Sequence, residues 1–332
     1  AQDVADAQAK SDQNLADAQK VATYTITDNI ATIADNIQNI TDDIATLQDL
    51  ADKNPGDTTI ADKLADAQQQ LTEAEAAKTA AESDLDQVAD QTTLADVADV
   101  VNDAADQVAQ AQENENQAQT DVADAQQQSA TNLATAKDDA KEAINQNLSD
   151  IDDDITQITA DIDALEQIAT DNPTNTTIAD KLADAKEQLA AAETAKDAAQ
   201  QALDAIDEQT TLADVATQEK AGETALADAD TAQQTADQDL ATAQDEAAKD
   251  LVADQVAGKA TVNETIKSIK DAITTITDDI ATLMDLAAKN PADTQIANDL
   301  ADAKEQLATA ETALSDAQDK LAAIDAAKVP AD

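Results

Sequence analysis

Residues 26–60 read ITDNIATIADNIQNITDDIATLQDLADKNPGDTTI, and this stretch decides the fold. Large aliphatic residues recur in it at steps of three or four, which places them along one face of an α-helix. Asp, Asn, Thr and Gln lie between them and form a polar face. The stretch therefore predicts a long amphipathic helix whose apolar face comprises Ile26, Ile30, Ile33, Ile37, Ile40, Ile44, Leu47 and Leu50.

The same pattern occurs three times. Asn54-Pro55, Asn172-Pro173 and Asn290-Pro291 are each separated by 118 residues, and the apolar series returns at 144–168 and 262–286. Residues 41–75 and 277–311 are identical at 25 of 35 positions. Such regular self-similarity indicates a tandem repeat. Copies that stay this alike add length or valency rather than build one active centre.

Each Asn-Pro pair is followed by a second helical pattern. Pro55 cannot lie in a helix interior and disfavours the helical conformation at Asn54, so the first helix should end there. Asp57 or Thr58 then caps the next helix, as Asp293 or Thr294 does in the third copy. The apolar positions of this second helix run through residues 60–88, and we expect it to end near residue 90.

A third helix begins at a capping box. Thr93 with Asp96, like Thr211 with Asp214, is typical of a helix N-terminus. From Leu94 to Asp171 there is neither Pro nor Gly. We therefore expect this helix to continue without a break into the first helix of the next copy.

These elements predict an all-α fold. It consists of tandem up-down-up three-helix bundles joined by long shared helices into an elongated rod. The expected divisions are a partial third helix of a preceding repeat (1–20), repeat 1 (21–137), repeat 2 (138–255), and the first two helices of repeat 3 (256–332).

Composition argues against several functions. The chain has 71 acidic and 19 basic residues, a net charge of -52, and no His, Cys, Phe or Trp. Without imidazole or thiol groups the usual catalytic bases, nucleophiles and zinc ligands are missing, so we expect no enzyme, metal centre or cofactor. The acidic surface disfavours nucleic acid, and no stretch is apolar enough for membrane insertion.

Four features of the sequence are candidate sites. Asp150, Asp152, Asp153 and Asp154 could bind Ca²⁺, but no glycine-containing loop gathers them, and the last three are expected on the solvated face. Lys78 and Lys196 take heptad positions where the third copy has Leu314. Their ammonium groups are expected to reach solvent from a bundle edge.

The Asn-Pro turns could be ligand-binding tips, although ending a helix already explains them. The sequons Asn39-Ile40-Thr41 and Asn175-Thr176-Thr177 are relevant only in a glycosylating host, and Ile40 belongs to the apolar face. We therefore expect no catalytic, cofactor-binding or metal-binding residue.

The isoleucine heptads followed by Lys53-Asn54-Pro55-Gly56-Asp57-Thr58-Thr59-Ile60 resemble the spectrin-like three-helix repeats of the stalk region of giant bacterial cell-surface adhesins. The aromatic positions usual in those modules are absent here. The resemblance implies an extracellular, cell-surface stalk that projects a binding domain away from the cell. Its partners would be the flanking repeats and terminal domains of the same parent protein, and the chain would be a monomeric rod.

The alternative is a multivalent three-helix binding module for a host or matrix protein. Such a module should carry an exposed apolar or aromatic patch at the same place in each repeat. The sequence instead has Asp, Thr and Gln on the polar faces of its helices.

Overall fold

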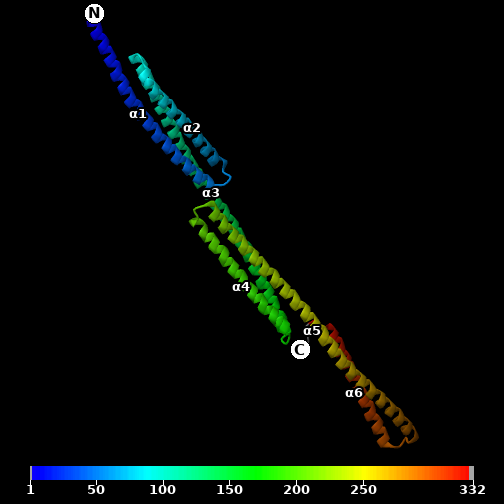
Figure 1. The fold of residues 1–332 in the computed structure, drawn as a ribbon. Coiled ribbons are helices and arrows are strands. Elements are labelled where there is room, and N and C mark those ends of the chain that lie inside the picture. The colour runs from blue at the N-terminus through cyan, green and yellow to red at the C-terminus, as the bar shows by residue number, and fades with distance from the viewer. Residues whose placement is uncertain (1, 329–332) are drawn as a thin grey trace. The chain divides into compact units, whose positions relative to one another are not determined.

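The computed structural model describes residues 2–328, and within them it is all-helical with no strand (Figure 1). The predicted all-α class is confirmed. The helices are α1 (Gln2–Lys53), α2 (Thr58–Gln87), α3 (Leu94–Asp171), α4 (Thr176–Ala205), α5 (Leu212–Lys289) and α6 (Thr294–Ala326), with 3₁₀ turns at Val88–Asp90 and Ile206–Glu208.

The helix ends follow the local sequence as predicted. α1 ends at Lys53, directly before Asn54-Pro55. Asp57 caps α2, because its side chain accepts a hydrogen bond from the Ile60 backbone N–H at 3.1 Å. Gly56 supplies the turn between them with a φ of 90°, a conformation that glycine adopts without steric cost.

The long third helix is also confirmed. Thr93 Oγ1 accepts from the Asp96 backbone N–H at 3.1 Å and opens α3, which runs for 78 residues. α5 begins in the same way: Thr211 Oγ1 accepts from the Asp214 N–H at 3.2 Å. α5 also has 78 residues.

The chain divides into two compact units. Unit 1 comprises residues 1–145 with 201–222, and unit 2 comprises residues 146–200 with 223–332. α3 and α5 each contribute to both units. The repeat boundaries expected from the sequence stay predictions.

In unit 1, α2 returns alongside α1, and α3 completes a shared core (Figure 1). Ile33, Ile40 and Leu47 of α1 are fully buried there. α3 contributes small side chains spaced by seven residues, which lets it approach the other helices closely. The buried residues from α2 and α3 are Ile60, Ala67, Ala74, Ala81, Ala111, Ala118 and Ala125.

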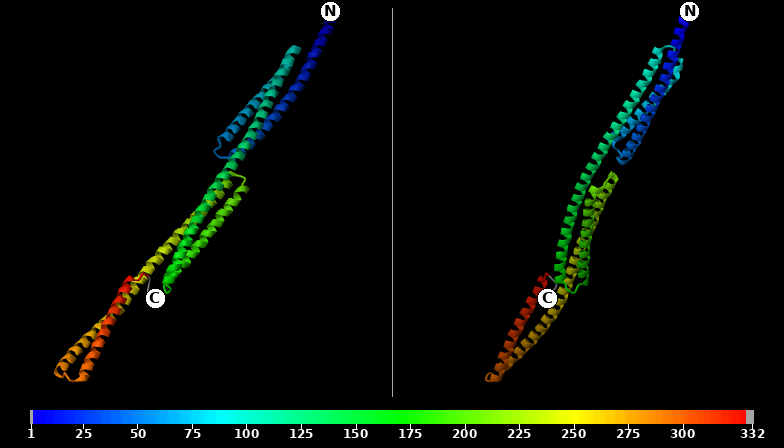
Figure 2. Two further views of the ribbon diagram at one scale, coloured as in Figure 1. Left: turned by 180° about the vertical axis from the view of Figure 1, so that it is seen from behind. Right: turned by 90° about the vertical axis from the view of Figure 1, so that its left-hand side faces the viewer.

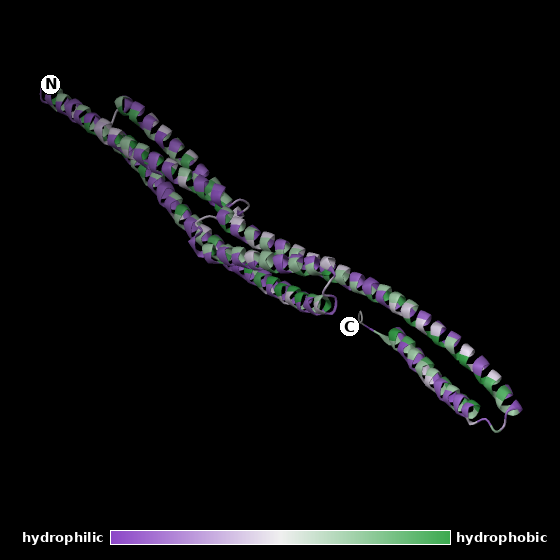
Figure 3. Ribbon diagram, turned by 90° about the horizontal axis from the view of Figure 1, so that it is seen from below, coloured by the Kyte–Doolittle hydropathy of each residue, from purple (hydrophilic) through white to green (hydrophobic). Residues whose placement is uncertain are grey.

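Unit 2 repeats this packing with α3, α4 and α5. Ile151, Ile158 and Leu165 of α3 are fully buried against alanines of α4 and α5. In α5 these include Ala229, Ala236 and Ala243. Apolar and polar residues alternate along the helices (Figure 3), which is the pattern expected where one face packs and the other is solvated.

The C-terminal part of α5 and α6 form an antiparallel pair within unit 2 (Figure 2). Most apolar positions on this pair are only partly buried, among them Ile269, Ile276 and Leu283. Leu286 is 40% exposed. Among the described residues, no third helix covers this pair.

Candidate functional site

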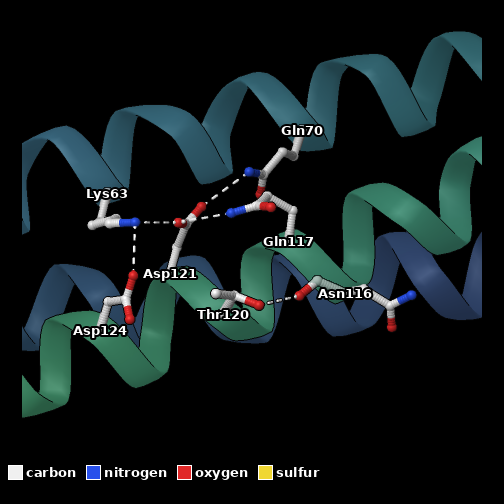
Figure 4. Close-up of polar contacts among 7 residues, drawn as sticks. All are labelled: Lys63, Gln70, Asn116, Gln117, Thr120, Asp121 and Asp124. Atoms are coloured by element: carbon white, nitrogen blue, oxygen red, sulfur yellow. Dashed lines mark hydrogen bonds and ion pairs between the residues drawn. The ribbon is translucent and has the colours of Figure 1, made fainter.

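A polar cluster in unit 1 surrounds Asp121 of α3 (Figure 4), and the exposure of Asp121 is 1%. Lys63 of α2 donates from Nζ to Asp121 Oδ1 at 2.9 Å and also pairs with Asp124 at 3.0 Å. Gln70 Nε2 donates to Asp121 Oδ2 at 3.0 Å, and Gln117 Nε2 donates to Oδ1 at 3.3 Å. The cluster therefore ties α2 to α3.

The same lysine–aspartate pair occurs one repeat later in unit 2. Lys181 Nζ lies 2.9 Å from Asp239 Oδ1 and 3.1 Å from Asp184 Oδ2. Asp239 is 5% exposed. Hydrogen bonds from their ammonium groups to Asp121 and Asp239 raise the pKa values of Lys63 and Lys181, so both lysines are charged at neutral pH.

Heptad geometry explains why these aspartates are buried. Asp121 comes three residues after Ala118 and four before Ala125, both fully buried, so it shares their face of α3. Alanine leaves room for a lysine to reach across from α2. A buried ion pair adds little net stability but is costly to break, and its best-attested role is to fix the register of helices.

A second contact set also repeats with the 118-residue period. In each copy a long side chain donates to a backbone carbonyl beyond the second helix: Gln19 to Gln91 O at 3.0 Å, Lys137 to Asp207 O at 2.9 Å, and Gln255 to Ala327 O at 3.1 Å. The last two copies add the ion pairs Lys141–Asp207 and Lys259–Asp325. These contacts hold the C-terminal end of each second helix against the helix that precedes it.

Unit 2 also contains two carboxyl pairs between α3 and α5. Burial raises the pKa of Asp154 to about 6, with a further contribution from Asp230. Burial and a hydrogen bond with Asp237 likewise raise the pKa of Asp161, whose exposure is 3%. Asp154 and Asp161 therefore take up a proton more readily than an ordinary aspartate does.

The expected position of Asp154 on the solvated face is wrong. Asp152 and Asp153 are exposed, but Asp154 is partly buried because it lies three residues after the core residue Ile151 and turns toward α5. Within residues 2–328 no group of three or more acidic side chains is arranged to hold a metal ion.

The candidate lysines Lys78 and Lys196 lie at the edges of the helix packing. Lys78 Nζ is 3.7 Å from Glu82, and Lys196 Nζ is 2.6 Å from Asp152 of α3. Their side chains are 38% and 44% exposed, as expected for ammonium groups that reach solvent.

The Asn-Pro turns form structural contacts. Asn54 is 3% exposed and donates from Nδ2 to Leu50 O and to Ser129 Oγ, both at 2.8 Å. The sequon asparagines are engaged as well. Asn39 Nδ2 donates to Glu115 at 2.8 Å, and Asn175 Nδ2 donates to Asp250 at 2.6 Å.

Sequence reasoning did not identify Asp121, Asp239 or the carboxyl pairs. One signal was present: Lys63 and Asp121 both recur at the 118-residue interval, as Lys181 and Asp239. Charged residues at the same heptad positions of two facing helices are candidates for an interhelical pair. The residues one repeat earlier are Asn36 with Gln112 and Asp43 with Gln119, so the repeat gives no signal for these two pairs.

The described helices contain no segment that is long and apolar enough to cross a membrane. Comparison of the chain with protein-family models, curated proteins and solved structures finds no match. Inferences about function therefore rest on the geometry of the chain and on its repeat.

Proposed function

We propose that the chain is a structural extender, a stalk segment of a large bacterial surface adhesin that projects a binding domain away from the cell. The observation that supports this most directly is the continuity of α3. Its residues 97–125 pack into the cores of unit 1, and its residues 151–168 pack into the core of unit 2. α3 is therefore one uninterrupted helix that contributes to the cores of both units.

In this proposal the finer architecture is a tandem array of up-down-up three-helix bundles forming a rod. Each shared helix of 78 residues advances about 117 Å, and each second helix returns about 50 Å, so a period adds roughly 65 Å. The contacts that support a fixed register are the Lys63–Asp121 and Lys181–Asp239 pairs.

The proposed role is not enzymatic, and its setting is extracellular at the cell surface. The net charge of -52 supports a solvated spacer that repels nucleic acid. Its partners would be flanking repeats and terminal domains of the same parent protein.

Display of one, two or three 118-residue periods between a surface anchor and a fluorescent binding domain tests this function. The height of the reporter should rise linearly, by about 65 Å per period. Glycine/serine linkers of equal length serve as controls, because their reach grows only with about the square root of length. A height that follows the control series would contradict an extender.

A further inference from the structure

The C-terminal part of α5 and α6 form the third copy of the repeat. They present a face that another helix covers in copies 1 and 2. Ile33, Ile40 and Leu47 in copy 1 are fully buried, whereas their equivalents Ile269, Ile276 and Leu283 are only partly buried. In copies 1 and 2 the equivalent face is covered by the N-terminal halves of α3 and α5. The shape of this face therefore fits a helix.

A groove between α5 and α6 marks where that helix would lie. Its lining includes Ile269, Ala313 and Ala317, and a second groove on α6 is lined in part by Asp302, Glu305 and Gln306. Copy 1 has an equivalent of the second groove at Asp66, Gln69 and Gln70, and there α3 residues including Gln117 line its other side. The covering helices in copies 1 and 2 are rich in alanine at seven-residue spacing.

Charge determines which helix fits. Copies 1 and 2 have Lys63 and Lys181 at the position that contacts a buried aspartate of the covering helix. The equivalent residue in copy 3 is Asp299, which is exposed. With Asp302 nearby, an aspartate on an incoming helix would meet like charge here instead of a lysine.

We propose that the α5–α6 face binds an alanine-rich amphipathic helix that carries a basic residue where α3 and α5 carry Asp121 and Asp239. Copies of this chain do not supply such a helix. Their own equivalents are Asp121, Asp239 and, near the start of α1, Asp3. Like charges directly opposed across an interface reject the wrong partner, so Asp299 selects a different helix.

A charge-swap experiment on the full chain tests this specificity. The probe is a fluorescently labelled peptide with the sequence of residues 212–255, either unchanged or with D239K. Fluorescence anisotropy at about 0.15 M NaCl measures its affinity for the chain. The D239K peptide should bind the unchanged chain about tenfold or more tightly than the native peptide.

The reciprocal variant should reverse the order. A chain with D299K should prefer the native peptide, since its lysine restores the arrangement of Lys181 with Asp239. The matched control is D271K, which changes the net charge equally at an exposed position of α5 outside both grooves and should keep the preference of the unchanged chain. Circular dichroism verifies that each variant keeps its helix content.

Equal affinity of the two peptides, or no binding of either, would overturn the proposal. The same holds if D299K and D271K have the same effect, because the preference would then follow net charge and not the residue at this face.

Discussion

At the scale of single residues, loss of the Lys63 side chain should destabilise unit 1. Its partner Asp121 is 1% exposed and would be left buried without a cation beside it. Lys63→Met should lower the free energy of unfolding by about 3–5 kcal/mol. Urea denaturation followed by circular dichroism measures the change.

Lys78→Met is the matched control for that substitution. Its pair with Glu82 is solvent-exposed, so its loss should cost less than about 1 kcal/mol. The combined variant Lys63→Met with Asp121→Leu should recover most of the stability, because no buried charge is left unpaired. Equal losses of unfolding free energy in Lys63→Met and Lys78→Met would show that the buried pair with Asp121 contributes no more than an exposed pair.

The carboxyl pairs predict a pH dependence of the stability of unit 2. The folded pKa of Asp154 is raised to about 6 and that of Asp161 is raised as well, above the ordinary value of 3.8. The folded state therefore binds protons more readily than the unfolded state, and unit 2 should gain stability as pH falls from about 7 toward 4.

Asp154→Asn with Asp161→Asn should raise the melting temperature at pH 7 and flatten this dependence. Asp163→Asn, an exposed neighbour on the same helix, is the control and should do neither. Thermal melts followed by circular dichroism across the pH range measure the melting temperature of each variant. Unchanged pH dependence in the double variant would mean that other carboxylates cause it.

At the scale of helices, the third copy should be the least protected against hydrogen exchange. Ile269 and Ile276 are partly exposed where Ile33 and Ile40 are fully buried, and residues 2–14 of α1 are exposed throughout. Local opening should therefore be easier in the α5–α6 pair and at the start of α1 than in α3 residues 151–168.

Exchange measured by mass spectrometry with peptide resolution tests this order. The internal repeat supplies the control, since peptides with nearly the same sequence in copies 1 and 3 have similar intrinsic rates. Equal protection of residues 41–75 and 277–311 would show that the α5–α6 face is covered in solution.

The helices could be predicted from sequence because their determinants are local. Pro55 ends α1, Asp57 caps α2, and the isoleucine series fixes which face packs. The polar contacts between helices, such as those of Asp121 and Asp154, could not be predicted in this way. Whether Asp154 meets water or Asp230 depends on how α3 and α5 are rotated against each other, which a single-helix pattern does not encode.

For the whole molecule, charge repulsion should govern stability. The net charge of -52 repels itself more strongly in the folded chain than in the expanded one. The melting temperature should therefore rise between low salt and about 1 M NaCl, where the Debye length falls to about 3 Å. A melting temperature independent of salt would indicate that the charges are already neutralised by specific partners or bound cations.

The central claim is that shared helices extend the chain, and small-angle X-ray scattering tests it most directly. If α3 and α5 carry the chain forward from one bundle to the next, the molecule should be about 200 Å long with a radius of gyration near 60 Å. A radius of gyration near 20 Å, the value for a compact chain of this length, would contradict the account.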